Sequence, residues 1–286
     1  MQSQTIAQVL TAVGRNVAPV DAQMLLQHVL NVNRTFLLTH PEHVLTSQQA
    51  ATFLKLIQQR IEGWPVAYLI GKREFYDLIF DVSEAVLIPR PETELLVEWA
   101  LELIPDNKPS NILELGTGSG AIAITIAKHR PQAHVTGVDL SVDALAVARQ
   151  NAIKLQADNL NWVAGSWFDE LSGRKFDLIV SNPPYVAEND AHLQQGDLRF
   201  EPQIALSAGL HGLACIMHII RLAPQHLSDA GWLLLEHGYD QAAECRRLLQ
   251  ERDFSNICSH PDLAGIMRVS GGQWNARADC NRFKPQ

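Results

Sequence analysis

Residues 112–127 read ILELGTGSGAIAITIA, and this stretch decides the predicted fold. The mainly apolar residues 112–115 predict a buried strand, the alternating glycines predict a tight turn, and residues 121–127 predict a helix. A glycine has no β-carbon to keep a ligand away from the backbone. The order strand, glycine turn, helix therefore predicts a pocket for a nucleotide-containing cofactor. The turn comprises Gly116, Thr117, Gly118, Ser119 and Gly120.

The sequence on both sides of this stretch alternates predicted strands with predicted helices. Such alternation is typical of an α/β domain with a mainly parallel, Rossmann-like sheet. The expected strands lie at 111–115, 134–138 and 160–163, in the segment ending at Asn182, and at 232–235. The expected helices lie at 93–104, at 120–129, after Ser141 and at 212–228.

Asp139 ends the strand that follows the glycine turn. An acidic side chain there can accept hydrogen bonds from both hydroxyls of a ribose. Because Ser141 begins a helix nearby, capping that helix is the competing role for Asp139. Glu114 could meet a cationic group of the cofactor or simply end its strand. A dinucleotide fingerprint would place glycine at the sixth position, where this chain has Ala121.

The second decisive stretch is FDLIVSNPPY at residues 176–185, where a buried strand stops at a polar amide and two prolines. Asn182 can offer its side-chain oxygen and Pro183 its backbone carbonyl, while the prolines remove backbone donors and stiffen the chain. Acceptors held in this way could align the NH2 of a planar amide or base. Pro184 continues the rigid segment, and Tyr185 adds a flat aromatic wall. The same four residues alone could also form an ordinary turn.

The N-terminal part differs in character from the rest of the chain. Residues 1–70 show short amphipathic helical patterns, with Asp21 as an expected helix N-cap and Thr46 with Gln49 as an expected capping box. Residues 73–90 indicate a hairpin. The predicted division is a helical domain at 1–70, a β-hairpin linker at 71–91 and a catalytic domain at 92–286.

Composition restricts the function classes. The chain has 286 residues, 47% of them apolar, and a net charge of −8, which argues against a large duplex-binding face. Its four cysteines show no metal-ligand spacing and suggest no disulfide framework. No apolar run approaches the roughly 20 residues of a membrane span, and no secretory signal is evident. We therefore expect a cytoplasmic protein without a metal and without a membrane partner.

Taken together, these motifs closely resemble the release-factor glutamine methyltransferases. That family methylates N5 of the glutamine in the Gly-Gly-Gln motif of class 1 peptide-chain release factors. The resemblance covers nearly the whole chain and weakens beyond Asp262. Further matching segments are Leu87–Glu94, Gly165–Phe168, Arg199–Pro202 and Leu235–Gly238.

The resemblance implies a class I methyltransferase fold and S-adenosylmethionine as methyl donor, with S-adenosylhomocysteine as product. It implies that Gly116–Gly120 hold the cofactor, that Asp139 binds its ribose, and that Trp167 lies along the adenine. It also implies that Asn182–Tyr185 grip the substrate glutamine, with Asn182 and Pro183 catalytic and Asn182 also beside the cofactor. In this family the helical N-terminal segment helps to engage the release factor.

Several residues keep open roles at this stage. Arg90 and Glu92 could close over the cofactor or form a surface pair. His237 is expected to be a hydrogen-bonded structural residue rather than a catalytic base. The chain also contains its own Gly271-Gly272-Gln273, which makes self-methylation conceivable, although a surface turn is the expected structure.

Three other functions compete with the main prediction. Methylation of adenine N6 in DNA or RNA presents nearly the same planar NH2 to Asn182 and Tyr185. The acidic balance and the lack of a basic recognition segment weigh against it, so no stable nucleic-acid binding is expected. An NAD-dependent oxidoreductase could share the general fold. A binding module that has lost turnover is the third, and the intact polar motifs argue against it.

Overall fold

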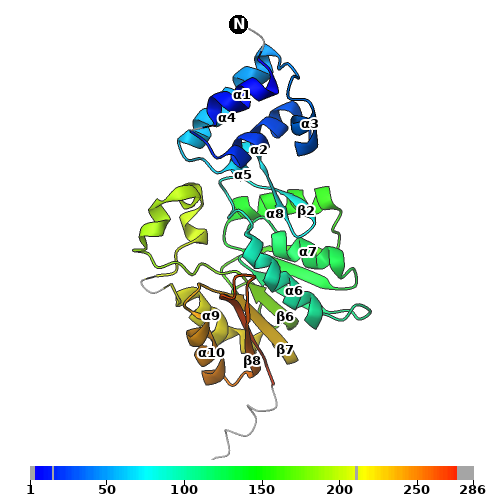
Figure 1. Cartoon of the computed structure of the whole chain (residues 1–286). Helices are drawn as coiled ribbons and strands as arrows, with labels where there is room; N and C mark the ends of the chain where they lie inside the picture. Colours follow the sequence, from blue (N-terminus) through cyan, green and yellow to red (C-terminus); the bar gives the residue numbers. More distant parts are fainter. Residues whose placement is uncertain (1–3, 15, 210–211, 276–286) are drawn as a thin grey trace, which may run out of the picture. The chain divides into compact units, whose positions relative to one another are not determined.

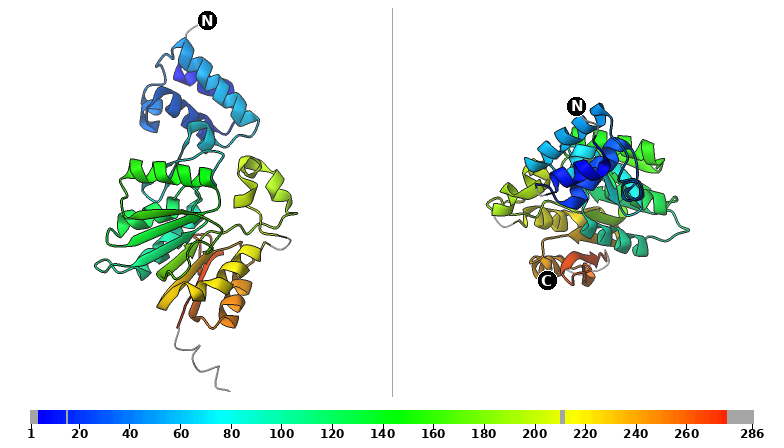
Figure 2. Two further views of the ribbon diagram at one scale, coloured as in Figure 1. Left: turned by 180° about the vertical axis from the view of Figure 1, so that it is seen from behind. Right: turned by 45° about the horizontal axis from the view of Figure 1, so that its top comes forward.

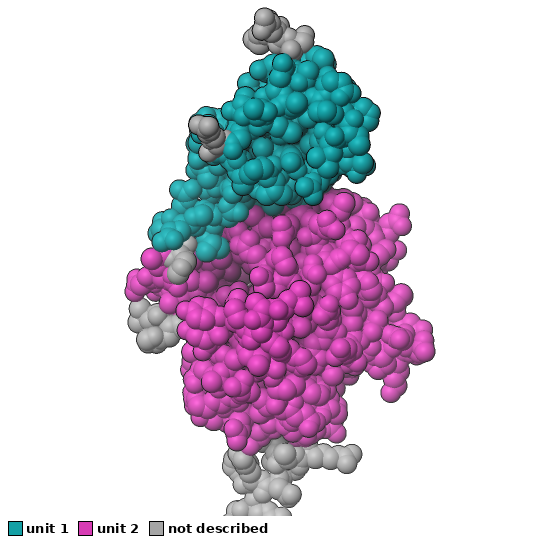
Figure 3. All heavy atoms as spheres, viewed as in Figure 1, with its two compact units in different colours: residues 1–72, 194–200 teal, residues 73–193, 201–286 magenta. Residues whose placement is uncertain are grey.

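The computed structural model describes residues 4–14, 16–209 and 212–275. The chain forms two compact units, shown in different colours in Figure 3: residues 1–72 with 194–200, and residues 73–193 with 201–286. Within the described ranges, no helix combines the length and the apolar character that crossing a membrane requires.

The first unit is a helical bundle. Its buried centre includes Leu25, Leu26 and Phe53, which carry no more than a trace of exposed surface. The predicted capping box is confirmed, because Thr46 and Gln49 bond to each other's backbone at the start of α4. The helices are α1 (Ile6–Val13), α2 (Pro19–Leu30), α3 (Arg34–Thr39), α4 (Ser47–Ile61) and α5 (Val66–Ile70), all labelled in Figure 1.

The predicted N-cap role of Asp21 is wrong. Helix α2 begins two residues earlier at Pro19, whose fixed φ suits the first helical turn, and its N-cap is Ala18. Asp21 instead accepts a hydrogen bond from Arg60 Nε at 2.8 Å. The acid therefore joins α2 to α4 rather than starting a helix.

A short segment from much later in the chain belongs to this same unit. It contains the 3₁₀ turn η3 (Gly196–Phe200). Arg60 Nη1 reaches Asp197 Oδ1 at 3.0 Å, and the ring centroids of Trp64 and Phe200 lie 4.7 Å apart. The chain thus leaves the second unit after residue 193, packs on the bundle, and returns at residue 201.

The second unit is built on a seven-stranded sheet with the strand order β5-β4-β3-β6-β7-β9-β8. The first five strands in that order are parallel, whereas β9 runs antiparallel to both β7 and β8. The strands are β3 (Asn111–Leu115), β4 (His134–Asp139), β5 (Leu160–Ala164), β6 (Phe176–Ser181), β7 (Leu227–Glu236), β8 (Ser255–Pro261) and β9 (Met267–Gln273). A mainly parallel sheet of this kind confirms the predicted α/β class.

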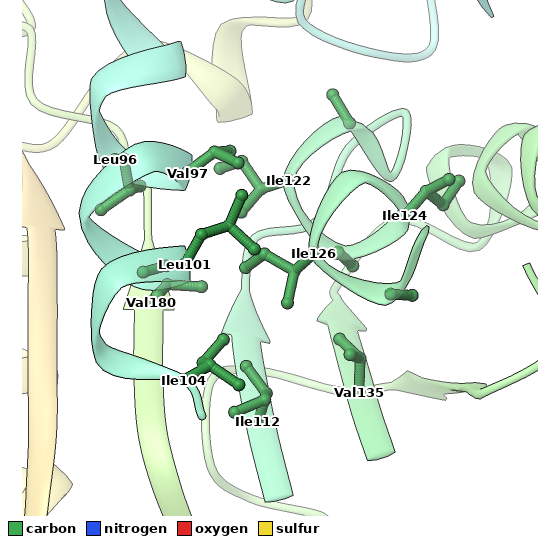
Figure 4. Packing of buried hydrophobic residues seen from close by; sticks show 14 of the residues in the cluster. Leu96, Val97, Leu101, Ile104, Ile112, Ile122, Ile124, Ile126, Val135 and Val180 are labelled. Carbon is green, nitrogen blue, oxygen red and sulfur yellow. The ribbon is translucent and has the colours of Figure 1, made fainter. Parts of the chain in front are cut away.

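Helices cover both faces of the sheet, as the two views in Figure 2 show. Successive residues of a strand point to opposite faces, so Ile112 joins one buried cluster and Leu113 the other. Figure 4 shows the first cluster, where side chains of α6 and α7 pack on β3, β4 and β6. The helices of this unit are α6 (Glu94–Leu103), α7 (Ala121–His129), α8 (Val142–Leu155), α9 (Ala214–Leu222) and α10 (Ala242–Glu251).

The predicted hairpin is present as β1 (Lys72–Phe75) and β2 (Leu78–Asp81). The predicted helix at 212–228 is shorter, because α9 ends at Leu222 and a 3₁₀ turn, η5 (Ala223–Gln225), contains Pro224. Proline cannot continue the backbone hydrogen bonds of a helix. Strand β7 consequently begins at Leu227, five residues before the predicted start.

The Gly271-Gly272-Gln273 tripeptide is not a surface turn, so that expectation is wrong. It lies in β9 between β7 and β8, with Gly271 opposite Leu234 on one side and Cys258 on the other. A β-carbon at Gly271 would come within 2.7 Å of the Leu233 carbonyl oxygen, so close packing explains the glycine. Gln273 donates its side-chain NH2 to Ala230 O at 2.9 Å. The tripeptide is part of the sheet, which gives no support to self-methylation.

Candidate active site

The glycine turn between β3 and α7 has the backbone form that the sequence predicts. Gly116, Gly118 and Gly120 all have positive φ, at 72°, 54° and 80°. A β-carbon on Gly120 would meet Ile124 Cδ1 at 2.8 Å, whereas one on Gly116 or Gly118 would meet nothing within 4 Å. Gly120 is therefore required for packing, and the other two present open backbone to a cavity.

Glu114 holds this turn in place through hydrogen bonds. Its carboxyl is buried, and one oxygen accepts hydrogen bonds from the Thr117 hydroxyl and from the Ala123 N–H at 3.0 Å. Burial raises the pKa of Glu114 to about 8. Both partners belong to the turn and to the first part of α7, so Glu114 links the end of β3 to the elements that follow it.

Asp139 lies at the end of β4, next to the glycine turn. Its Oδ2 accepts from the Gly118 N–H at 2.8 Å and its Oδ1 from the Ser141 N–H at 2.9 Å. The N-cap of α8 is Ser141, whose side chain accepts from Ala144 N, so Asp139 does not cap the helix. Burial is the largest influence on the pKa of Asp139 and raises it. The carboxyl thus orders the turn and also borders the cavity.

The cavity has a volume of about 280 Å³ and is formed entirely by the second unit. Trp167 forms part of its wall and has a φ of 51°, a backbone form that a bulky residue rarely adopts. The neighbouring loop at 202–207 adds the apolar side chain of Ile204. The cavity therefore combines an aromatic and aliphatic wall with the polar groups of Asp139, Ser141 and Asn182.

The Asn-Pro-Pro-Tyr segment meets the glycine turn because β3 and β6 are adjacent and parallel. Ser181 pairs with Leu115 and donates its hydroxyl to the Leu115 carbonyl at 2.7 Å. The carboxyl ends of two parallel neighbours lie at the same edge of the sheet, where ligands bind in such folds. Asn182 borders both the main cavity and a smaller recess that reaches Glu114 and Arg90. The two predicted motifs thus form one site.

Behind Asn182 lies a polar group that sequence reasoning missed. Asn182 Nδ2 donates to Thr93 Oγ1 at 3.1 Å, and the Thr93 side chain also lies close to the Glu236 carboxyl, whose pKa it lowers. Tyr185 donates its hydroxyl to Glu236 Oε1 at 3.2 Å. Burial raises the pKa of Glu236 to about 7, and burial followed by the charge of Glu236 also raises the pKa of Tyr185. The only sequence signal was an acid ending a strongly apolar strand.

His237 and Arg90 are both held by polar contacts with buried groups. His237 is fully buried, with Nδ1 2.9 Å from Gly238 O and Nε2 2.8 Å from Ser270 Oγ, and burial lowers its pKa. The prediction of a structural histidine is confirmed. Arg90 Nη2 pairs with the buried carboxyl of Glu201 at 2.6 Å, so it joins two of the matching segments rather than forming a surface pair with Glu92.

A family model described as PrmC N-terminal domain matches residues 3–71, and one described as methyltransferase small domain matches residues 92–198. A release factor glutamine methyltransferase from Aliivibrio fischeri is 45% identical over 93% of this chain and 94% of its own. One from Neisseria gonorrhoeae is 48% identical over 89% of this chain and 93% of its own. The chain belongs to the release factor glutamine methyltransferase family.

The fold of the second unit is also shared with solved methyltransferases. The 16S rRNA methyltransferase RsmC of T. thermophilus, solved with AdoMet and guanosine, matches with a TM-score of 0.52 at 18% identity. The match covers 71% of this chain and 49% of that chain. Membership of the release factor glutamine methyltransferase family makes this chain an S-adenosylmethionine-dependent methyltransferase and removes the oxidoreductase alternative.

Proposed function

We propose that this enzyme transfers a methyl group from S-adenosylmethionine to the side-chain nitrogen N5 of the glutamine in the Gly-Gly-Gln motif of class 1 release factors. The observation that carries the proposal is the position of Asn182. It stands at the edge of a glycine-lined cavity, with Nδ2 engaged by Thr93. That contact leaves Oδ1 to accept a hydrogen bond from a substrate amide.

The residues of the cavity fit the proposed cofactor. Gly116 and Gly118 leave room that any β-carbon would fill, Asp139 offers an acceptor for ribose hydroxyls, and Trp167 offers a flat wall for adenine. Thr117, Ser119 and Gly120 complete the cofactor turn. S-adenosylmethionine, when bound, supplies a methyl group on a positively charged sulfur.

The role of the protein in this reaction is alignment. An amide nitrogen is a weak nucleophile, because its lone pair is delocalised into the carbonyl. Asn182 Oδ1 and the Pro183 carbonyl would accept the two N–H groups of the substrate, fix the nitrogen in line, and stabilise the positive charge that it gains. Pro184 keeps this segment stiff, and Tyr185 would contact the planar amide.

Three segments of the chain have separate proposed roles. We propose that the helical residues 1–70 engage the release factor, that residues 71–91 act as the linker, and that residues 92–286 carry the chemistry. The net charge of −8 favours a protein substrate over a stable complex with nucleic acid. A substrate that belongs to the translation machinery supports a cytoplasmic location for the reaction.

The direct test is transfer of labelled methyl from S-adenosylmethionine to a purified class 1 release factor. The matched control is the same factor with the glutamine of its Gly-Gly-Gln motif changed to alanine. We expect label on the first protein alone. Label on neither factor, together with label on DNA or RNA tested in parallel, would move the activity to adenine N6.

Asp139→Ala should mainly weaken cofactor binding, by roughly tenfold or more, because it removes the ribose acceptor and also the partner of the Gly118 N–H. Calorimetric titration with S-adenosylmethionine measures this effect. Asp143→Ala removes an exposed acid from the first turn of α8, four residues further along the chain, and is the matched control. Equal affinity in the Asp139 variant and the wild type would refute the ribose assignment.

A further inference from the structure

The first member of the polar group behind Asn182 is a buried threonine. Thr93 is the last residue of the 3₁₀ turn η1 (Pro91–Thr93), which leads into α6, and its backbone is already helical. Its side chain makes no capping hydrogen bond to the helix. Its hydroxyl is buried and instead accepts from Asn182 Nδ2 at 3.1 Å. The Thr93 hydroxyl is therefore engaged with the proposed catalytic amide rather than with the helix backbone.

Glu236 is the second unusual member of this group. It ends β7 with 2% of its surface exposed, and its Oε2 has no hydrogen-bond partner among the described residues. Burying a carboxyl with an unsatisfied oxygen costs free energy, and such a cost is found most often where the group has a function. The Glu236 side chain does not border the cavity, so it acts through its neighbours.

The position of the Thr93 hydroxyl proton would determine which way the amide of Asn182 faces. A threonine hydroxyl has one proton. If Thr93 donates that proton to Glu236, it can only accept from Asn182, so the NH2 of Asn182 must face Thr93. If the proton pointed to Asn182 instead, the amide would turn over. Its NH2 would then face the substrate NH2, and two donors cannot bond to each other.

We propose that Thr93 and Glu236 are positioning residues, which fix the Asn182 side chain with its oxygen toward the substrate amide. The proposal rests on the proposed function, because it needs a substrate that donates N–H groups. Tyr185 belongs to the same polar group, since its hydroxyl donates a hydrogen bond to Glu236 Oε1. One buried carboxylate thereby orients both polar side chains of the Asn-Pro-Pro-Tyr segment.

The role proposed for Glu236 predicts a pH dependence of methyl transfer. Only the ionised carboxyl is a pure acceptor, so the rate should fall as pH decreases through about 7, where Glu236 takes up a proton. The charged and titratable groups around this carboxyl are Glu92, which raises its pKa, Arg268, which lowers it, and the Tyr185 hydroxyl. Glu236→Gln cannot titrate, so its rate should lose this step.

Thr93→Val keeps the shape of the side chain and removes the hydroxyl, and Thr93→Ser restores the hydroxyl. With a release factor as substrate, we expect Thr93→Val to lower kcat by about 10- to 30-fold. Thr93→Ser should recover most of that loss. The affinity for S-adenosylmethionine, measured by calorimetry, should change by no more than about threefold in either variant. Equal losses in both variants, or no loss in Thr93→Val, would overturn the proposal.

A second measurement does not depend on turnover. The side-chain NH2 signal of Asn182 in ¹⁵N NMR is identified by its absence from Asn182→Ala. It should exchange with water more slowly in the wild type than in Thr93→Val, and an unchanged signal would reject the orienting contact. If the wild type methylates no release factor while this signal changes as expected, the positioning stands and the proposed substrate is wrong.

Discussion

Asn182→Ala is expected to cut methyl transfer by about 10²-fold or more, as for loss of one preorganised polar group in an active site. The variant removes the only side-chain amide oxygen of the Asn-Pro-Pro-Tyr segment and leaves the Pro183 carbonyl as the sole proposed acceptor. Affinity for S-adenosylmethionine should stay within about threefold of the wild type, because the glycine turn, Asp139 and Trp167 are unchanged. Single-turnover transfer of labelled methyl to a release factor measures the first effect, and calorimetry the second.

Asn161→Ala is the matched control for this variant. Asn161 is an exposed asparagine on β5, in the sheet whose strand β6 ends just before Asn182, but it lies away from the cavity, and its loss should change neither quantity. Turnover that is unaffected in Asn182→Ala would remove Asn182 from the mechanism. A large loss of cofactor affinity with normal turnover at saturation would instead make Asn182 a cofactor residue only.

The joining of the two motifs could be predicted from sequence because it depends on local signals and one general rule. The glycine turn after β3 and the Asn-Pro-Pro-Tyr segment after β6 each follow a buried strand. Parallel strands place such ends at one edge of the sheet. In this chain, the Ser181 hydroxyl donates a hydrogen bond to the Leu115 carbonyl and so joins the ends of β6 and β3. The family resemblance rested on these same residues.

Several failures of prediction share a physical cause, which is pairing between residues far apart in the chain. Gly271 reads as a turn residue until Leu234 and Cys258 are known to lie beside it in the sheet. Asp21 reads as a helix cap until Arg60 is known to reach it. No local pattern reveals that the carboxyl of Glu236 lies close to Thr93, 143 positions earlier in the sequence.

Asn151→Ala should lower the stability of the second unit by about 3 kcal/mol, because buried backbone groups lose their partners at about 1–3 kcal/mol each. The side chain is fully buried in α8 and connects three segments. Its Oδ1 accepts from Asp81 N at 2.7 Å, and its Nδ2 donates to Asp81 O and Ser119 O, both at 2.9 Å. Asp81 ends the hairpin, and Ser119 belongs to the cofactor turn.

Thermal unfolding measures this effect, and a loss of about 3 kcal/mol corresponds to a decrease in Tm of roughly 6–12 °C for a unit of this size. Gln150→Ala, at the exposed neighbouring position of the same helix, should leave Tm almost unchanged. Because Ser119 O loses its donor, the variant should also bind S-adenosylmethionine more weakly. A normal Tm would show that other contacts hold the hairpin, whereas a lower Tm with unchanged affinity would separate the hairpin from the cofactor turn.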